Sequence, residues 1–200
     1  NGSIALCDAG TGIGKTYAYL VAGVVLRRYQ SRAGLPNQPL LISTSSIALQ
    51  GAIIHDYLPF LSKVMMADGM LDSPLRAVLR KGKSHYVCDA RLMKRLQTAN
   101  LDRKNPLAKA ALLSMRDHLD LDMAPHLSGY DRERICVPPT CDCGKTECRY
   151  LCYLDVCASE RYAIQVCNHN LLLADAIHQG SGKRPILPDS CAIVMDEAHK

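Results

Sequence analysis

The stretch that decides the fold is Ala9-Gly10-Thr11-Gly12-Ile13-Gly14-Lys15-Thr16, a glycine-dense turn between an apolar run and a helical pattern. Glycines leave room for backbone N–H groups to point at a phosphate, and the following helix directs its partially positive N-terminus to the same place. We expect Lys15 to reach the outer phosphates of a nucleotide and the Thr16 hydroxyl to bind Mg2+. All eight residues are therefore predicted to bind ATP, although Ala9 stands where the usual G-x-x-x-x-G-K-[ST] pattern has glycine.

An acidic pair follows the last apolar run of the sequence. Cys191–Met195 is predicted to be a buried strand, and Asp196-Glu197-Ala198-His199 comes directly after it. An acidic pair at the carboxyl end of a parallel strand lies in the crevice where open α/β sheets bind ligands. We expect Asp196 to share Mg2+ with Thr16 and Glu197 to orient and deprotonate the attacking water. Lys15, Asp196 and Glu197 are the predicted catalytic residues.

Strand and helix patterns alternate along much of the chain, which predicts an α/β fold with a parallel sheet. The expected strands are Ile4–Cys7, Pro39–Thr44, Arg76–Leu79, Ile164–Cys167 and Cys191–Met195. The expected helices are Tyr17–Tyr29, Ile47–Tyr57, Asn105–Leu119 and Asn170–Ala176. Pro59 is expected to stop or kink the second of these helices, and Ser45 or Ser46 to cap it.

Basic residues are concentrated between Arg76 and Lys104. This stretch holds nine of them against two acidic residues, whereas the net charge of the whole chain is only +5. Such clusters are as often solvated surface as binding sites. Beside a nucleotide-driven motor, the stretch is interpreted as a track for a phosphate backbone, with Lys81 and Lys83 as candidate contacts.

Cysteines are also unevenly placed. Of the ten, six fall within 22 residues (Cys136, Cys141, Cys143, Cys148, Cys152 and Cys157), and Cys88 stands upstream of them. In an intracellular ATPase this pattern favours a metal or an iron–sulfur cluster over disulfides. Residues 125 to 157 show little apolar periodicity, so we expect them to need a bound metal centre to fold. Cys7, Cys167 and Cys191 are interpreted as small core residues.

The composition excludes other classes. Hydrophobic residues make up 48% of the chain, with one Phe and no Trp, so the core is expected to be aliphatic. No apolar run approaches the ~20 residues of a membrane span, and the first residues do not resemble a signal peptide. The chain is therefore expected to be cytoplasmic, with no membrane partner, and to be a piece of something longer.

Several stretches in the same order resemble a known family. They are Ala9–Thr16, Thr44–Gln50, Arg80–Cys88, Asn168–Asp175 and Asp196–His199. Together they resemble the first motor domain of the DinG/XPD-type iron–sulfur DNA helicases of superfamily 2, and the bacterial DinG-type members in particular.

The resemblance implies a RecA-like P-loop NTPase sheet carrying an inserted, mainly helical or irregular cysteine-rich domain. The implied divisions are residues 1–79 for the first part of the motor domain, 80–160 for the inserted iron–sulfur domain and 161–200 for the return to the motor domain. The implied activity is ATP-dependent DNA unwinding, with 5′-to-3′ movement on single-stranded or forked DNA in DNA repair. The full-length protein is expected to have a second RecA-like domain and an Arch domain.

The resemblance also implies further site residues. Thr44 and Gln50 belong to a motif that touches single-stranded DNA. The favoured ligands of a [4Fe–4S] cluster are Cys88, Cys143, Cys148 and Cys152, with Cys157 or Cys141 as substitutes. The spacing permits Zn2+ equally well. Two other functions stay open: an ATPase scaffold or nucleic-acid-binding component of a defence or repair complex, and an RNA helicase.

Overall fold

The computed structural model describes residues 3–10, 12–98, 106–141, 148–183 and 185–198. The chain divides into two compact units. The sheet unit consists of Asn1–Arg80 and Glu160–Lys200, and the helical unit consists of Lys81–Ser159. Each unit is described by itself below.

Parallel strands form the centre of the sheet unit, which confirms the predicted α/β fold class. In the described part of the chain the sheet has four strands in the order β2-β3-β1-β4, and every neighbouring pair is parallel. The strands are β1 (Leu40–Thr44), β2 (Ala77–Leu79), β3 (Ile164–Cys167) and β4 (Ala192–Asp196). Every residue of β1 and β3 is buried, as expected for strands that are covered on both faces.

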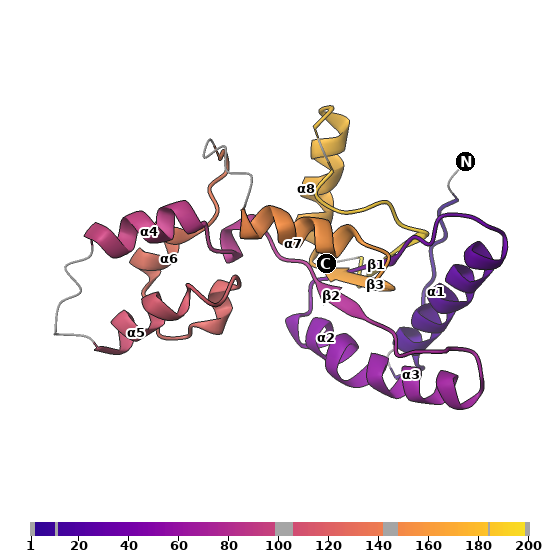
Figure 1. Ribbon diagram of the computed structural model, residues 1–200. Coiled ribbons are helices and arrows are strands. Elements are labelled where there is room, and N and C mark those ends of the chain that lie inside the picture. The colour runs from indigo at the N-terminus through magenta and orange to yellow at the C-terminus, as the bar shows by residue number, and fades with distance from the viewer. Residues whose placement is uncertain (1–2, 11, 99–105, 142–147, 184, 199–200) are drawn as a thin grey trace. The chain divides into compact units, whose positions relative to one another are not determined.

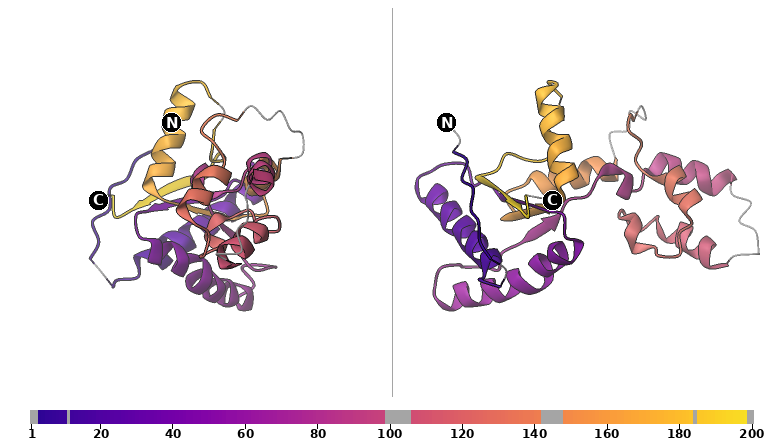
Figure 2. Two further views of the ribbon diagram at one scale, coloured as in Figure 1. Left: turned by 90° about the vertical axis from the view of Figure 1, so that its left-hand side faces the viewer. Right: turned by 180° about the vertical axis from the view of Figure 1, so that it is seen from behind.

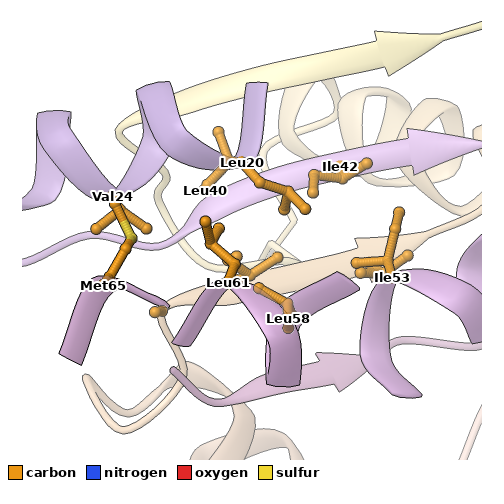
Figure 3. Packing of buried hydrophobic residues seen from close by; sticks show 11 residues of the cluster. Leu20, Val24, Leu40, Ile42, Ile53, Leu58, Leu61 and Met65 are labelled. Atoms are coloured by element: carbon orange, nitrogen blue, oxygen red, sulfur yellow. The ribbon is translucent and has the colours of Figure 1, made fainter. Parts of the chain in front are cut away.

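Helices cover both faces of this sheet. Helices α1 (Lys15–Arg32), α2 (Ile47–Ala52) and α3 (Leu58–Ala67) lie on one face, and α8 (His169–Gly180) lies on the other (Figures 1 and 2). The larger core forms between α1, α2, α3 and the sheet (Figure 3). Its buried members are Leu20, Val24, Leu40, Ile42, Ile53, Leu58, Leu61, Met65, Ala163, Ile164 and Val166. The core is aliphatic, as predicted.

The helix after β1 does not end at Pro59. Ser46 caps it by accepting a hydrogen bond from Leu49 N at 3.2 Å. Helix α2 continues through a π-helical turn, Ile53–Tyr57, directly into α3, which carries Pro59 in its first turn. Proline lacks the N–H that an α-helix needs and its ring clashes with the carbonyl four residues earlier. Widening the preceding turn accommodates that clash, so the helix does not stop at Pro59. The kink, the other predicted outcome, stays a prediction.

Two strand predictions need correction. Residues 3–10, all described, form no strand, and Ile4 and Leu6 are 94% and 95% exposed. Strand β4 lies at the edge of the sheet and is not buried, because Ile193 and Met195 are 56% and 46% exposed. An apolar pattern supplies side chains that can be buried, but a buried strand also needs a hydrogen-bonded neighbour and a covering layer. On the outer side of β4, the described residues provide no further strand and no covering layer. Cys7, expected in the core, is exposed.

The helical unit has an apolar core of its own. Its helices are α4 (Asp89–Thr98), α5 (Pro106–Ser114), α6 (Gly129–Ile135) and α7 (Arg149–Ala158), with 3-10 turns at Lys83–His85 and Leu121–Met123. The core residues are Val87, Leu92, Ala111, Leu112, Met115, Leu121, Ala124, Leu127 and Ile135. The expected need of residues 125 to 157 for a bound metal centre stays a prediction, because this core takes only Leu127 and Ile135 from that range. The apolar residues are spread over short elements, each too short to show a period.

The described helices include none that is long and apolar enough to cross a membrane.

Candidate nucleotide-binding site

The predicted phosphate loop leads directly into α1. Gly12 and Gly14 have φ angles of 79° and 84°, in the left-handed region that glycine enters without strain. Gly14 is the N-cap of α1, and a Cβ added at Gly10, Gly12 or Gly14 would meet no described atom within 4 Å. The loop therefore faces open space in front of a helix N-terminus, which suits a phosphate group. Thr11, predicted to belong to the loop, lies outside the described residues.

Lys15 joins this loop to the acidic pair. Its Nζ donates a hydrogen bond to Ala9 O at 3.1 Å, which places the ammonium group across the loop. The same Nζ lies 3.7 Å from Glu197 Oε1. A partly exposed ion pair of this length contributes little to stability. Its importance is geometric, because it brings together two motifs from opposite ends of the sequence.

The sheet register places the acidic pair at the carboxyl end of β4. Asp196 is the last residue of that strand and lies opposite Thr44 of β1. Glu197 follows with a φ of 56°, which is uncommon for a residue with a side chain and costs free energy. This tight turn directs the chain so that Glu197 meets Lys15. His199 of the predicted motif is outside the part of the chain that the structure describes.

Tyr19 lies at the same place, although the sequence did not single it out. Burial raises the pKa of Tyr19 to about 12, the neighbouring Thr16 hydroxyl lowers it, and the charge of Asp196 raises it. Thr16 and Asp196 therefore both influence this hydroxyl. The Tyr19 hydroxyl is buried and makes no well-formed hydrogen bond among the described residues. The available signal was its position three residues after Thr16, on the same face of α1.

These residues fit Mg2+ and a nucleotide chemically. Thr16 and Asp196 offer oxygen ligands, which Mg2+ prefers, while Lys15 and the backbone N–H groups of the loop offer donors to phosphate oxygens. When bound, Mg2+ would be held by Thr16 and Asp196 and would offset the negative charge of the phosphates. Glu197 provides a carboxylate within reach of the same position.

The two predicted contacts of the DNA-binding motif are buried. Thr44 is fully buried, its Oγ1 accepts from Ser46 N at 3.2 Å, and its carbonyl accepts from Gln50 Nε2 at 2.9 Å. Both side chains therefore hold the turn between β1 and α2. The exposed residues of this turn are Ser45, Ile47 and Ala48, so these three are better placed to meet a partner.

Much of the basic stretch is used inside the helical unit. Lys81 Nζ lies 2.6 Å from Asp120 Oδ2 and 2.8 Å from Asp122 Oδ2. Burial lowers the pKa of Lys81, but the hydrogen bonds to these two carboxylates outweigh it and the net shift is upward. Lys83 donates to Pro139 O. Arg95 Nε pairs with Asp131 Oδ1 at 2.6 Å. These groups are less available to phosphates than the sequence suggests.

The predicted cluster cysteines lie in and around two helix starts of the helical unit. Cys88 is buried directly before α4, Cys148 is the N-cap of α7, and Cys152 is exposed in α7. Asp89 and Arg149 join the two helix starts through an ion pair of 2.5 Å. Cys143 lies outside the described residues. Within the described ranges, no three His, Cys, Asp or Glu residues gather closely enough to hold a metal ion.

The substitute cysteines are also placed. Cys157 is buried in α7, and Cys141 is exposed. Helix N-termini favour negative charge, so the convergence of two of them beside Cys88 and Cys148 suits an anionic thiolate-bound group. Of the four favoured ligands, the structure brings the segments of these two together.

The parallel α/β sheet, with a glycine-rich loop close to an acidic pair, has the layout of a P-loop nucleotide-binding domain. The chain is 29% identical to the ATP-dependent DNA helicase YoaA of Escherichia coli, with 96% of this chain matched. It is 27% identical to the ATP-dependent DNA helicase DinG of Photobacterium profundum, also over 96% of the chain. The 3'-5' exonuclease DinG of Bacillus subtilis is 27% identical over 98% of the chain. No protein-family model matches.

The chain is thus similar over nearly its whole length to DinG-type helicases, which confirms the resemblance that the motifs carried. It spans only part of those proteins, 29% of the YoaA length, 28% of the Photobacterium DinG length and 20% of the Bacillus protein length.

Proposed function

We propose that this chain carries the ATP-hydrolysing site of a DinG-type, ATP-dependent DNA helicase. The observation that carries the proposal is the 3.7 Å approach of Lys15 Nζ to Glu197 Oε1, which gathers the phosphate loop and the acidic pair at one position. The names of the relatives support ATP as the fuel and DNA as the substrate. In the complete protein, a second RecA-like domain and an Arch domain would complete the motor.

The proposed mechanism starts from the contacts of Lys15. Phosphate oxygens entering the loop compete with Ala9 O and Glu197 for its ammonium group. Once Lys15 turns to phosphate, the Glu197 carboxylate is released to orient the attacking water and accept its proton. Thr16 and Asp196 would hold Mg2+. Hydrolysis in this site would drive 5′-to-3′ movement on single-stranded or forked DNA in DNA repair in the cytoplasm.

The proposal is tested by Lys15→Ala. We expect ATP affinity of this chain to fall about ten- to a hundredfold, because charge-assisted hydrogen bonds to the phosphates are lost. Calorimetric titration with Mg2+ and ATP measures this, and Lys63→Ala, an exposed lysine of α3, is the control. In the full-length protein, DNA-stimulated ATP hydrolysis should disappear as well. Unchanged ATP affinity in Lys15→Ala would overturn the assignment.

We also propose that the helical unit holds a [4Fe–4S] cluster through Cys88, Cys143, Cys148 and Cys152, with Cys157 or Cys141 as substitutes. The support is the ion pair that joins the segments of Cys88 and Cys148, together with the two helix N-termini there. Four thiolates are the ligand set such clusters use. Anaerobic purification followed by iron and sulfide assays tests this. If the purified protein is colourless and carries zinc, the proposed cluster is wrong and the cysteines form a structural Zn2+ site.

One relative favours a second candidate function. The Bacillus protein is named as an exonuclease, not as a helicase, although it matches this chain over 98% of its residues. The same fold can therefore belong to a protein with another activity, in which it would act as an ATPase scaffold or a nucleic-acid-binding component. Turnover separates the two. If the full-length Lys15→Ala protein keeps its activity on nucleic acid, the scaffold is favoured. Whether the substrate is RNA or DNA is tested by comparing ATP hydrolysis in the presence of single-stranded RNA and of single-stranded DNA.

A further inference from the structure

A basic cavity lies at the opposite end of the strands from the candidate ATP site. Its volume is about 420 Å³. It is lined by the C-terminal half of α1, the loop between α3 and β2, and residues just before β1 and β3. Arg76 and Ala163 directly precede strands, so the cavity is at the amino ends of the strands. The phosphate loop and the acidic pair are at the carboxyl ends.

Positive charge predominates around this cavity. Three separate segments contribute the arginines Arg27, Arg28, Arg32, Arg76 and Arg161. Only two acidic residues, Asp72 and Glu160, also line it. Among the described residues, none of these five arginines has a carboxylate within the 4.0 Å that defines an ion pair. Five guanidinium groups against two carboxylates leave an excess of positive charge, which a bound anion would offset.

The arginines divide into two kinds. Arg27 donates to Asn37 O, Tyr162 O and Glu160 O at 3.4, 3.4 and 3.2 Å, and Arg28 donates to Met70 O. These two hold the wall of the cavity. Arg32, Arg76 and Arg161 are exposed and make no side-chain hydrogen bond to any residue that the structure describes. Each guanidinium group carries five N–H donors. The donors of these three arginines are therefore available to a ligand.

We propose that this cavity binds a small phosphate-bearing anion, at a second site separate from the ATP site. A tetrahedral dianionic phosphate can meet guanidinium groups from three directions, whereas a planar carboxylate pairs with one or two. The volume lies in the range of small-molecule sites. Asn37 also lines the cavity. The inference does not rest on the proposed helicase function.

Pyrophosphate is the probe, and the Lys15→Ala chain is the background that removes binding at the phosphate loop. In that background we expect Arg76→Gln/Arg161→Gln to weaken pyrophosphate binding at least about tenfold, since charged hydrogen bonds are lost. The matched control is Lys63→Gln/Lys183→Gln, which removes the same charge from exposed positions of the sheet unit outside the cavity. We expect it to change affinity less than about twofold, because distant surface charges are screened.

A second pair tests geometry beyond charge. Arg76→Lys/Arg161→Lys keeps the charge but loses bidentate donation, so its affinity should fall between the wild type and the glutamine variant. The phosphate could come from a small molecule or from a nucleic-acid backbone. Separate titrations of the Lys15→Ala chain with pyrophosphate and with a single-stranded oligonucleotide distinguish these two sources. Binding of the oligonucleotide alone would overturn the proposal of a small ligand. The absence of pyrophosphate binding in the Lys15→Ala chain would also overturn it. So would an equal loss of pyrophosphate affinity in Arg76→Gln/Arg161→Gln and in the control Lys63→Gln/Lys183→Gln. None of these results bears on ATP binding in the wild-type chain.

Discussion

Tyr19 is the residue whose role differs most from what its position in the sequence suggests. An aromatic residue in an apolar helix is normally interpreted as core, yet this hydroxyl is buried near Thr16 and Asp196 without a well-formed hydrogen bond among the described residues. A buried hydroxyl in that state costs free energy in the folded chain.

Tyr19→Phe should therefore stabilise the nucleotide-free chain by at most about 1 kcal/mol, since it removes a buried hydroxyl whose contact with Thr16 falls short of a well-formed hydrogen bond. Urea unfolding without nucleotide measures this. Tyr29→Phe is the control, because Tyr29 is exposed on the same helix. Its hydroxyl is solvated in both states, so no change is expected. A loss of stability in Tyr19→Phe would show that the hydroxyl has a partner in solution.

Asp122 should make the helical unit sensitive to acid. Burial raises the pKa of Asp122, but hydrogen bonds from Lys81 and Arg132 outweigh burial and hold this pKa well below its usual range. A carboxylate with a lowered folded pKa stabilises the fold above its unfolded pKa of about 4. That stabilisation is lost as the pH falls from there toward the folded pKa.

Asp122→Asn should lower the stability of the chain at neutral pH by less than about 1 kcal/mol, because the carboxylate is partly exposed and screened by solvent. It should also flatten the dependence of stability on pH below about pH 4. Urea unfolding at a series of pH values measures both effects. Asp117→Asn, at an exposed aspartate of the same unit, should leave the acid dependence in place.

At the scale of helices and strands, apolar runs in the sequence predicted the central strands of the sheet. Strand Ile164–Cys167 was predicted to the residue, and β1 differs from the prediction only by Pro39. Both strands are central and buried, so their apolar runs are unbroken. Ile4–Cys7 has the same kind of run but forms no strand. A strand is completed by its neighbour, and no local pattern can report whether a neighbour is present.

Helix α1 packs closely on β1 at Gly23, which leads to a prediction about stability. A Cβ added at Gly23 would lie 2.5 Å from Leu40 Cδ2, and Leu40 is buried in the core. Overpacking costs about 1–3 kcal/mol and the gain in helix propensity returns about 1 kcal/mol. Gly23→Ala should therefore destabilise the chain by about 1 kcal/mol.

Gly51→Ala in α2 is the matched control, because an added Cβ there meets no described atom within 4 Å. It should stabilise the chain by about 0.5–1 kcal/mol through helix propensity alone. Urea unfolding of both variants gives the comparison. The interpretation fails if the two substitutions shift stability in the same direction.

At the scale of the whole molecule, the candidate site was the easiest part to predict and the helical unit the hardest. Lys15 and Glu197 belong to motifs whose chemistry fixes residue type and spacing, so sequence alone pointed to both. The core of the helical unit draws single residues from several short helices and turns, among them Leu92, Leu121 and Ile135. No window of sequence contains that core, and it was therefore missed.

That core changes what loss of a cluster ligand should do. The nine buried residues of that core include none of the proposed cluster cysteines, and Cys88 packs with Tyr86 and Val137 in a separate, smaller cluster. Cys88→Ser should therefore remove the colour, iron and sulfide of anaerobically purified protein while helix content, followed by circular dichroism, is largely kept. ATP affinity should be unchanged, since the phosphate loop belongs to the sheet unit.

The control for Cys88→Ser is Cys167→Ser, which changes a buried cysteine of the sheet unit that is not a proposed ligand. It should keep the full iron and sulfide content and lose only some stability, because it buries a more polar group than the thiol. If Cys88→Ser unfolds the helical unit completely, the metal centre, and not the apolar core, holds that unit together. If it also abolishes ATP binding, the nucleotide site depends on the helical unit and the two units do not act independently.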